Sequence, residues 1–263
     1  MSDRGFSLAS VVLAFFQIAG AVAAVFLGLK MAEVQGEWVP YAISGGGGFL
    51  GGWFAARASR GQTIIEPVLG AVLVTGLFFG TIAASPLGPW LWGVARDQSI
   101  MTMVRTAGPV LGGALVGAFI SEKLLGEATT SGIPWVLYFL LAAFGGCLTA
   151  IMGAGLAGLV DARAVEHRDL VFLAMVGAGC LLSGMAGGGT ARRRPLGAAF
   201  LGGAIGTAAF ALVAYQAGQQ VSAPGMELID QNIWGEVALF GGAGGFVTTL
   251  GATLGWALFG GQT

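Results

Sequence analysis

The chain has 263 residues, of which 56% are hydrophobic and only 10% are charged, and its mean hydropathy is +0.82. Soluble domains carry roughly 25% charged residues, so this composition excludes a water-soluble globular domain and indicates an integral membrane protein. The formal net charge is -1, with 12 basic and 13 acidic side chains standing between apolar stretches. That pattern excludes a nucleic-acid surface and a polybasic lipid anchor.

Eight apolar segments follow one another along the chain, and each is close to the roughly 20 residues that a membrane-crossing helix needs. They cover residues 8–30, 38–57, 63–84, 100–121, 134–160, 169–188, 195–216 and 233–259. The first contains AVAA (Ala21–Ala24), which is similar to a signal-peptidase site, but its 19-residue apolar run, Val11–Leu29, continues past that motif. We therefore predict a retained helix, with cleavage as the alternative, in an all-α polytopic membrane protein.

The basic residues between these segments predict the orientation, because short cytoplasmic loops are enriched in lysine and arginine. The richer side holds Arg4, Arg57, Arg60, Lys123 and Arg192–Arg194, and the other side holds Lys30, Arg96, Arg163 and Arg168. We expect both termini in the cytoplasm and the bundle in the inner or plasma membrane. Tryptophans at the expected span ends, such as Trp38 and Trp234, agree with an aromatic belt.

The two halves of the sequence are similar to each other. Leu50–Gly76 aligns with Leu182–Gly206 through a glycine-rich helix end, an arginine-bearing turn, a proline and the letters LGA. Gly112–Ile120 aligns with Gly244–Ala252. We predict two related four-helix halves, residues 1–126 and 127–263, with chance similarity of glycine-rich sequence as the alternative. An even number of spans per half would make the repeats parallel.

Glycine is the most prominent residue type, with 48 copies. Small residues four apart let membrane helices approach closely, because helices in lipid associate through packing. The predicted packing positions are Gly47, Gly48, Gly51, Gly52, Gly113, Gly117, Gly184, Gly188, Gly202 and Gly206. They favour a close-packed bundle, and a narrow glycine-lined passage is the alternative.

Four polar side chains within the spans are candidates for a substrate path: Gln17, Glu66, Arg105 and Glu236. Gln17 is expected in the middle of the first span, where it either contacts substrate or bonds to a neighbouring helix. In the repeat alignment Arg105 and Glu236 fall at nearly equivalent positions, so we expect either an ion pair near the pseudo-axis or two side chains that snorkel separately.

Hydroxyls inside the spans can bond to the carbonyls of their own helix and are weak evidence for a path. They are Ser44, Thr75, Thr149, Ser183, Thr207, Thr248 and Thr249. The single histidine, His167, is expected in a solvated outer loop, and Cys147 and Cys180 are expected to be buried and unpaired. The sequence contains no HExxH motif, P-loop or paired intramembrane aspartates, so we expect no enzyme, no cofactor and no metal site.

The eight-span layout with GGGGF (Gly45–Phe49) is similar to the small anion exporters of the sulfite-export type. The chain lacks the further run that those proteins carry after their glycine motif, so no residue roles are transferred. Two function classes remain. The first is a small-solute or ion transporter with a path between the halves. The second is a non-catalytic scaffold or accessory subunit. Expected partners are the lipid bilayer and either further copies of the chain or other membrane subunits.

Overall fold

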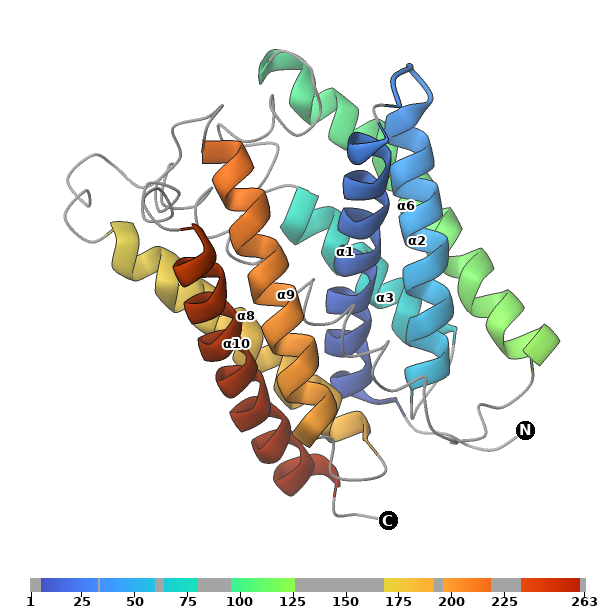
Figure 1. Cartoon of the computed structure of the whole chain (residues 1–263). Coiled ribbons are helices and arrows are strands. Elements are labelled where there is room, and N and C mark those ends of the chain that lie inside the picture. Colours follow the sequence, from blue (N-terminus) through green and yellow to red (C-terminus); the bar gives the residue numbers. More distant parts are fainter. Residues whose placement is uncertain are drawn as a thin grey trace.

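The computed structural model describes residues 6–32, 34–59, 64–79, 96–125, 168–191, 196–218 and 233–260. These segments form the helices α1 (Leu8–Met31), α2 (Val39–Ala58), α3 (Ile65–Leu73), α6 (Arg96–Leu125), α8 (Arg168–Thr190), α9 (Leu196–Gly218) and α10 (Ile233–Gly255). Two of them continue as π-helical segments, α3 into η1 (Val74–Phe79) and α10 into η4 (Trp256–Gly260). Figure 1 shows these helices as a bundle.

Four described segments are long and apolar enough to cross a membrane: Leu8–Phe26, Val104–Lys123, Leu173–Thr190 and Ile233–Phe259. The apolar segments Ile65–Leu77 and Leu196–Ala209 are shorter, and the glycine-rich α2 has 20 residues. Helices therefore occupy every expected span except 134–160, which lies outside the described residues. The structure supports an all-helical protein with at least four candidate spans, and the number eight stays a prediction.

Prolines and one glycine fix several helix boundaries. Pro40 and Pro67 lie in the first turns of α2 and α3, where the missing N–H removes no helical bond. The turn before α2 contains Gly36 with φ of 149°, a backbone conformation that residues with a Cβ rarely adopt. α2 ends where Ser59 turns to an extended conformation.

α1 lies at the centre of the described bundle. It packs against α2, α3 and α8. On one side of it, α2 packs closely against α6, and on the other, α10 packs against both α8 and α9. The beginning of α1, the end of α8 and η4 meet at one end of the bundle, where a Cβ on Gly189 would lie 3.4 Å from Cβ of Ala9 and 3.3 Å from Cβ of Phe259.

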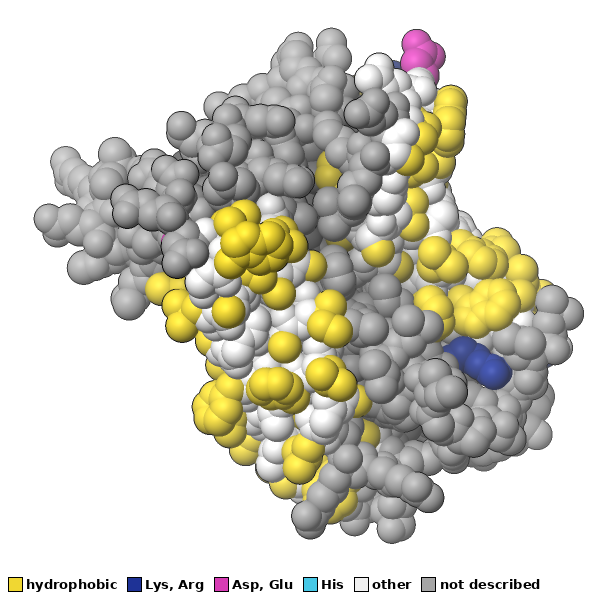
Figure 2. Space-filling model, viewed as in Figure 1, with side chains coloured by type: hydrophobic (Ala, Val, Ile, Leu, Met, Phe, Trp, Pro, Cys, Tyr) yellow, Lys and Arg dark blue, Asp and Glu magenta, His cyan; other side chains and the backbone are white. Residues whose placement is uncertain are grey.

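The outward faces of the described helices are apolar. Exposed bulky side chains include Leu115 and Phe119 on α6 and Leu239 and Phe246 on α10. Figure 2 shows hydrophobic side chains spread over the described part of this face, with an acidic group at its upper end, where α2 begins. Such a surface fits contact with lipid tails, because a soluble monomer rarely exposes so large an apolar area.

Candidate functional site

One face of α1 carries small and polar side chains along its whole length. Its residues, spaced alternately three and four apart, are Ser7, Ser10, Ala14, Gln17, Ala21, Ala24 and Gly28, and we call this face the α1 stripe. The spacing places them above one another on one side of the helix. Ser10, Ala14, Gln17 and Ala21 are buried, whereas Ala24 and Gly28 are exposed, and a Cβ on Gly28 would meet nothing within 4 Å. The stripe is therefore buried from Ser10 to Ala21 and exposed at Ala24 and Gly28.

The α1 stripe faces the gap between α3 and α8. Ala14 contacts α3, since a Cβ on Gly70 would lie 2.7 Å from Cβ of Ala14. Leu13 belongs to the same buried cluster as Ala186 of α8. Gln17 follows these two α1 residues by three and four positions, so it occupies the next turn directly above both. The side chain of Gln17 is therefore placed between α3, on one side of the bundle, and α8, on the other.

Gln17 is fully buried, and within the part of the chain that the structure describes neither its Nε2 nor its Oε1 has a hydrogen-bonding partner. Leaving a buried polar group unbonded costs about 1–3 kcal/mol, so native proteins keep few of them. The expected alternative for this side chain, a hydrogen bond to a neighbouring helix, is not formed.

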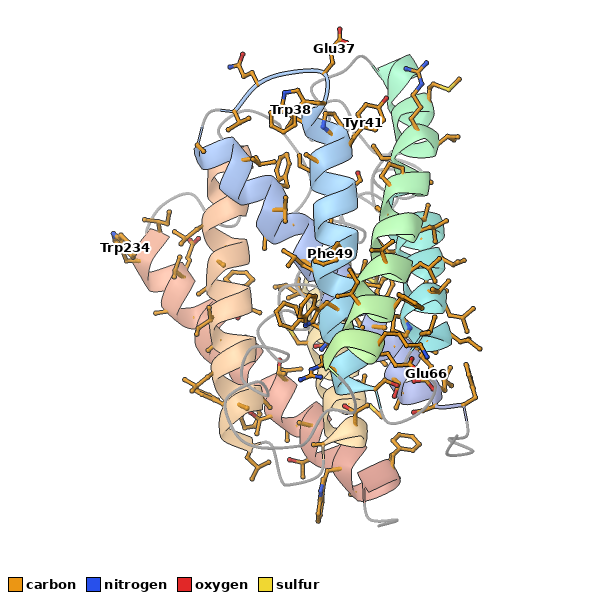
Figure 3. The ribbon with its side chains drawn as sticks, turned by 90° about the vertical axis from the view of Figure 1, so that its right-hand side faces the viewer. Glu37, Trp38, Tyr41, Phe49, Glu66 and Trp234 are labelled. Atoms are coloured by element: carbon orange, nitrogen blue, oxygen red, sulfur yellow. The ribbon has the colours of Figure 1, made fainter. Side chains whose placement is uncertain are left out.

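Glu66, in the first turn of α3, is also fully buried. Its Oε1 accepts a hydrogen bond of 2.6 Å from the backbone N–H of Ser7, and its Oε2 accepts one from the Ser59 hydroxyl. Ser7 and Ser10 are joined in turn, with 3.1 Å between their hydroxyl oxygens. We call these four residues the Glu66 cluster. Figure 3 shows Glu66 at the opposite end of the bundle from Glu37 and Trp38.

The Glu66 cluster and Gln17 belong to one continuous polar face. Ser7 and Ser10 are members of both the cluster and the α1 stripe, and Gln17 lies two helical turns beyond Ser10. At 1.5 Å per residue that separation is roughly 10 Å along the helix axis. The structure thereby brings two of the four candidate residues, Gln17 and Glu66, to the same face of α1.

The other two candidates stand apart. Arg105 is exposed on α6, and Glu236 on α10 keeps its Oε2 buried without a hydrogen-bonding partner. The ion pair that we considered between them is not formed. The reason is the packing of their helices, because α6 contacts α2 while α10 contacts α8 and α9 (Figure 1).

The hydroxyls within the helices behave as expected at most described positions. Ser44, Thr75, Ser183, Thr207 and Thr249 each donate to a carbonyl three or four residues earlier in their own helix. Thr248 is the exception, since its Oγ1 is buried and has no partner. Thr149, His167 and Cys147 lie outside the described residues, and Cys180 is buried and forms no disulfide.

Glycines of α2 lie against two neighbouring helices at once. A Cβ would lie 2.8 Å from the backbone N of Val22 if added to Gly47, and 2.5 Å from Cα of Ile18 if added to Gly51, so both face α1. Gly48 and Gly52 face α6 instead.

The contact between α2 and α6 has glycine on both sides. A Cβ on Gly48 would lie 2.5 Å from the carbonyl oxygen of Val110, and one on Gly52 would lie 2.6 Å from Cα of Ala114. From α6, Gly113 and Gly117 approach the backbone of α2, where their Cβ atoms would meet the N of Phe49 at 2.8 Å and the N of Trp53 at 3.0 Å. The two backbones are therefore in direct contact.

The contact between α8 and α10 is built in the same way. Cβ atoms on Gly184 and Gly188 would meet the backbone of Ala252 within 3.0 Å, and those on Gly251 and Gly255 would meet the backbones of Leu181 and Met185. Gly202 and Gly206 of α9 are buried.

The sequence interpretation missed the serines of the Glu66 cluster. Ser7 precedes the first span and Ser59 follows the second, so both counted as loop residues. The available signal was the alternating three-and-four spacing of Ser7, Ser10 and Gln17, which marks one helix face. Nothing in the sequence indicates that Ser59 reaches Glu66.

These features define a helical membrane protein with buried polar side chains on several helices, among them Gln17 on α1 and Glu66 on α3. Part of the chain is similar to MntP, a proposed manganese efflux pump of Cronobacter sakazakii (strain ATCC BAA-894), with 37% identity over 111 residues. The aligned region covers 40% of this chain and 59% of that relative. No protein-family model and no solved structure matches the chain.

The likeness to a transporter and the apolar helices together support a location in the inner membrane. They also agree with the expectation that the chain is not an enzyme, since the relative is named as a pump.

Proposed function

We propose that the protein is a membrane ion transporter and that ions move along the α1 stripe. The observation that carries this proposal is Gln17, a fully buried amide with two unbonded polar atoms between α3 and α8. Polar groups that mark an ion path inside the membrane commonly face the bundle interior. The partial likeness to a proposed manganese efflux pump supports the same class.

The burial pattern along the α1 stripe supports a path that is closed on one side. Gln17 and Glu66 are both fully buried, while the stripe is exposed at Ala24 and Gly28. A transporter that opens alternately to the two sides needs such a barrier on at least one of them. In this arrangement the barrier lies between Gln17 and the Glu66 end of the bundle.

The predicted duplication of the chain, together with a similar packing in each half, supports the proposal. In the first predicted half α2 packs against α6 through glycines, and in the second α8 packs against α10 in the same manner. The sequence alignment pairs the end of α2 with the end of α8, and Gly112–Ile120 of α6 with Gly244–Ala252 of α10. Transporters with internal repeats place their ion sites at the interface between the repeats. If the halves are repeats, α1 and α3 belong to the first and α8 to the second, and the α1 stripe would lie between them.

Flux measurements in liposomes test this function. Purified protein would be reconstituted around a metal-sensitive dye, and uptake of Mn²⁺ would be compared between the natural chain and a Gln17→Leu variant. Leucine has a similar volume but no polar atoms, so we expect flux to fall at least tenfold. Ala107→Leu on α6, distant from the stripe in the sequence, serves as a matched control. Equal flux with leucine or glutamine at position 17 would refute the path.

The second candidate function is an accessory subunit, and the outer face of α6 favours it. Gly108 and Gly112 stand four residues apart on this helix, and Cβ atoms there would meet nothing within 4 Å. Exposed Val104, Leu115 and Val116 flank them. This arrangement is typical of surfaces that pack against another membrane helix.

The native mass of gently purified protein distinguishes the two candidates. A stoichiometric partner chain would favour the subunit, particularly if Gly112→Ile released it without changing the thermal stability of the remaining chain. Protein that purifies alone or as a homo-oligomer would leave the transporter as the better supported function.

A further inference from the structure

We propose that the outer face of α6 binds an anionic phospholipid, with the phosphate at Arg105 and Tyr41 and an acyl chain over Gly108 and Gly112. Arg105 is exposed, and it forms no ion pair or hydrogen bond with any side chain that the structure describes. The apolar, membrane-spanning part of α6 begins beside it, at Val104. An arginine at the end of a span reaches the headgroup level, where lipid phosphates lie.

Tyr41 lies at the level of Arg105 on the neighbouring helix α2. The two helices run in the same direction, and a Cβ on Gly45 would lie 3.8 Å from Cβ of Pro109. Tyr41 and Arg105 come one helical turn before this contact, each on its own helix. Tyr41 is exposed, and its hydroxyl has no hydrogen-bonding partner within the described ranges. Two donors therefore stand beside the contact between α2 and α6, at the end of α2 that carries Trp38 (Figure 3).

These two groups suit a phosphate. A guanidinium binds phosphate oxygens through two parallel N–H bonds, and the phenol of Tyr41 adds a further donor. Glu37 lies one turn further toward the end of α2, and it forms no ion pair with Arg105. The charge of Arg105 therefore remains available to an anionic headgroup.

Gly108 and Gly112 leave an open strip below Arg105, which we call the α6 notch. Both glycines are exposed, and Cβ atoms on them would meet nothing within 4 Å. Exposed valines stand one turn away at either end, Val104 before Gly108 and Val116 after Gly112. Because the missing side chains allow close approach to the helix backbone, an acyl chain can lie in the notch while its headgroup meets Arg105.

α10 supplies an internal comparison, because it contacts α8 as α6 contacts α2. In both pairs, glycines four apart face carbonyl oxygens four apart: Gly48 and Gly52 face Val110 and Ala114, and Gly184 and Gly188 face Thr248 and Ala252. These contacts match α6 with α10 position by position, in a register that differs from the sequence alignment.

The matched positions of α10 carry neither the charge nor the notch. Counted from the glycine contacts, the three residues of α6 and their counterparts are Arg105 and Ala243, Gly108 and Phe246, and Gly112 and Leu250. All three counterparts are exposed. Bulky apolar side chains thus cover this face of α10, as contact with lipid tails requires, whereas on α6 a cation and an open strip occur together.

The position of Arg105 favours a lipid over a second helix in the notch. A helix laid over Gly108 and Gly112 would also cover Arg105, and burying an unpaired charge is costly unless the helix brings an acidic group of its own. A phospholipid brings both the acyl chain and the negative charge. The inference does not depend on the proposed transport function.

Lipid binding to the purified full chain tests the proposal. Native mass spectrometry in detergent micelles compares added phosphatidylglycerol, which is anionic, with zwitterionic phosphatidylcholine. We expect tighter binding of phosphatidylglycerol, and a loss of about fivefold for Arg105→Gln, about threefold for Gly112→Leu and about twofold for Tyr41→Phe. Lys123→Gln removes an exposed charge at the other end of α6, and Ala243→Leu adds bulk to the matched face of α10, so both should bind as the natural chain does.

The remaining outcomes decide against the site. Equal affinity for the two lipids, or equal phosphatidylglycerol affinity in the natural chain and Arg105→Gln, would overturn it. A preference that survives both Gly108→Leu and Gly112→Leu would overturn it too, since the charge would then act without the notch. A dimer or a co-purifying chain that Gly112→Leu releases would assign the face to a protein partner instead. Flux into liposomes enters none of these outcomes, so the lipid site and the transporter fail separately.

Discussion

The backbone N–H of Ser7 donates a 2.6 Å hydrogen bond to Oε1 of Glu66 and so ties the residue before α1 to the first turn of α3. The hydroxyl of Ser59 reaches the other carboxylate oxygen from the end of α2. One side chain thereby joins three segments that are far apart in the sequence. Its removal should affect the fold.

Replacing Glu66 with alanine should lower the free energy of unfolding by about 1–2 kcal/mol, because the Ser7 N–H and the Ser59 hydroxyl would both lose this acceptor in a partly buried place. Glutamine retains one acceptor oxygen, so Glu66→Gln should cost clearly less. Equilibrium unfolding in mixed micelles measures both. Equal stability of the alanine variant and the natural chain would show that water replaces the carboxylate without loss.

Gln17→Leu should raise stability by about 1 kcal/mol while it reduces transport. The amide has no partner, so an apolar side chain of similar volume removes a desolvation cost and leaves nothing unbonded. Thermal unfolding in detergent, measured beside flux in liposomes, tests the two effects together. A loss of stability would instead indicate that the amide holds a neighbouring helix, and its role in a path would have to be abandoned.

Adding even one methyl group at the contact between α2 and α6 should lower the stability of the protein. Gly52→Ala places a Cβ 2.6 Å from Cα of Ala114, so the helices must separate, at a cost of about 1–3 kcal/mol. Gly46→Ala on the same helix meets nothing within 4 Å and should be neutral or slightly stabilising. These two variants compare the same change, glycine to alanine, at two positions of α2. Similar effects at both would mean that glycine acts through backbone flexibility and not through close approach.

Arg105 and Glu236 should show no energetic coupling. They occupy helices that pack on different partners, and additivity holds for groups that share none. In a double-mutant cycle with Arg105→Gln and Glu236→Gln, the effects on unfolding should add within about 0.5 kcal/mol. A coupling above 1 kcal/mol would reveal a contact that this conformation does not form.

Composition and hydropathy were sufficient to predict the helical membrane class, because apolar runs of about 20 residues are typical of helices that cross a membrane. The individual residues of the candidate site were harder to predict from the sequence. Gln17 could be predicted because one amide within 19 apolar residues is conspicuous. Of the two alternatives for Arg105 and Glu236, the described residues form no ion pair between them, because sequence equivalence of two positions does not bring their helices together. The bond from Ser59 to Glu66 could not be predicted, since it depends on where the end of α2 comes to lie.

The backbone contacts between α2 and α6, and between α8 and α10, have a mechanical consequence. In each of these contacts, glycine brings the backbones of the two helices together, so no side chain lies between them that could change rotamer when one helix tilts. Each pair of helices should therefore move as a rigid body. α1 meets α8 through side chains instead, because Leu13 and Phe16 share one buried cluster with Ala186 of α8 and Ala58 of α2, and side chains can slide over one another. Any rocking of the molecule would then be concentrated where α1 and α8 meet, next to Gln17, and a crosslink between those two helices would stop it.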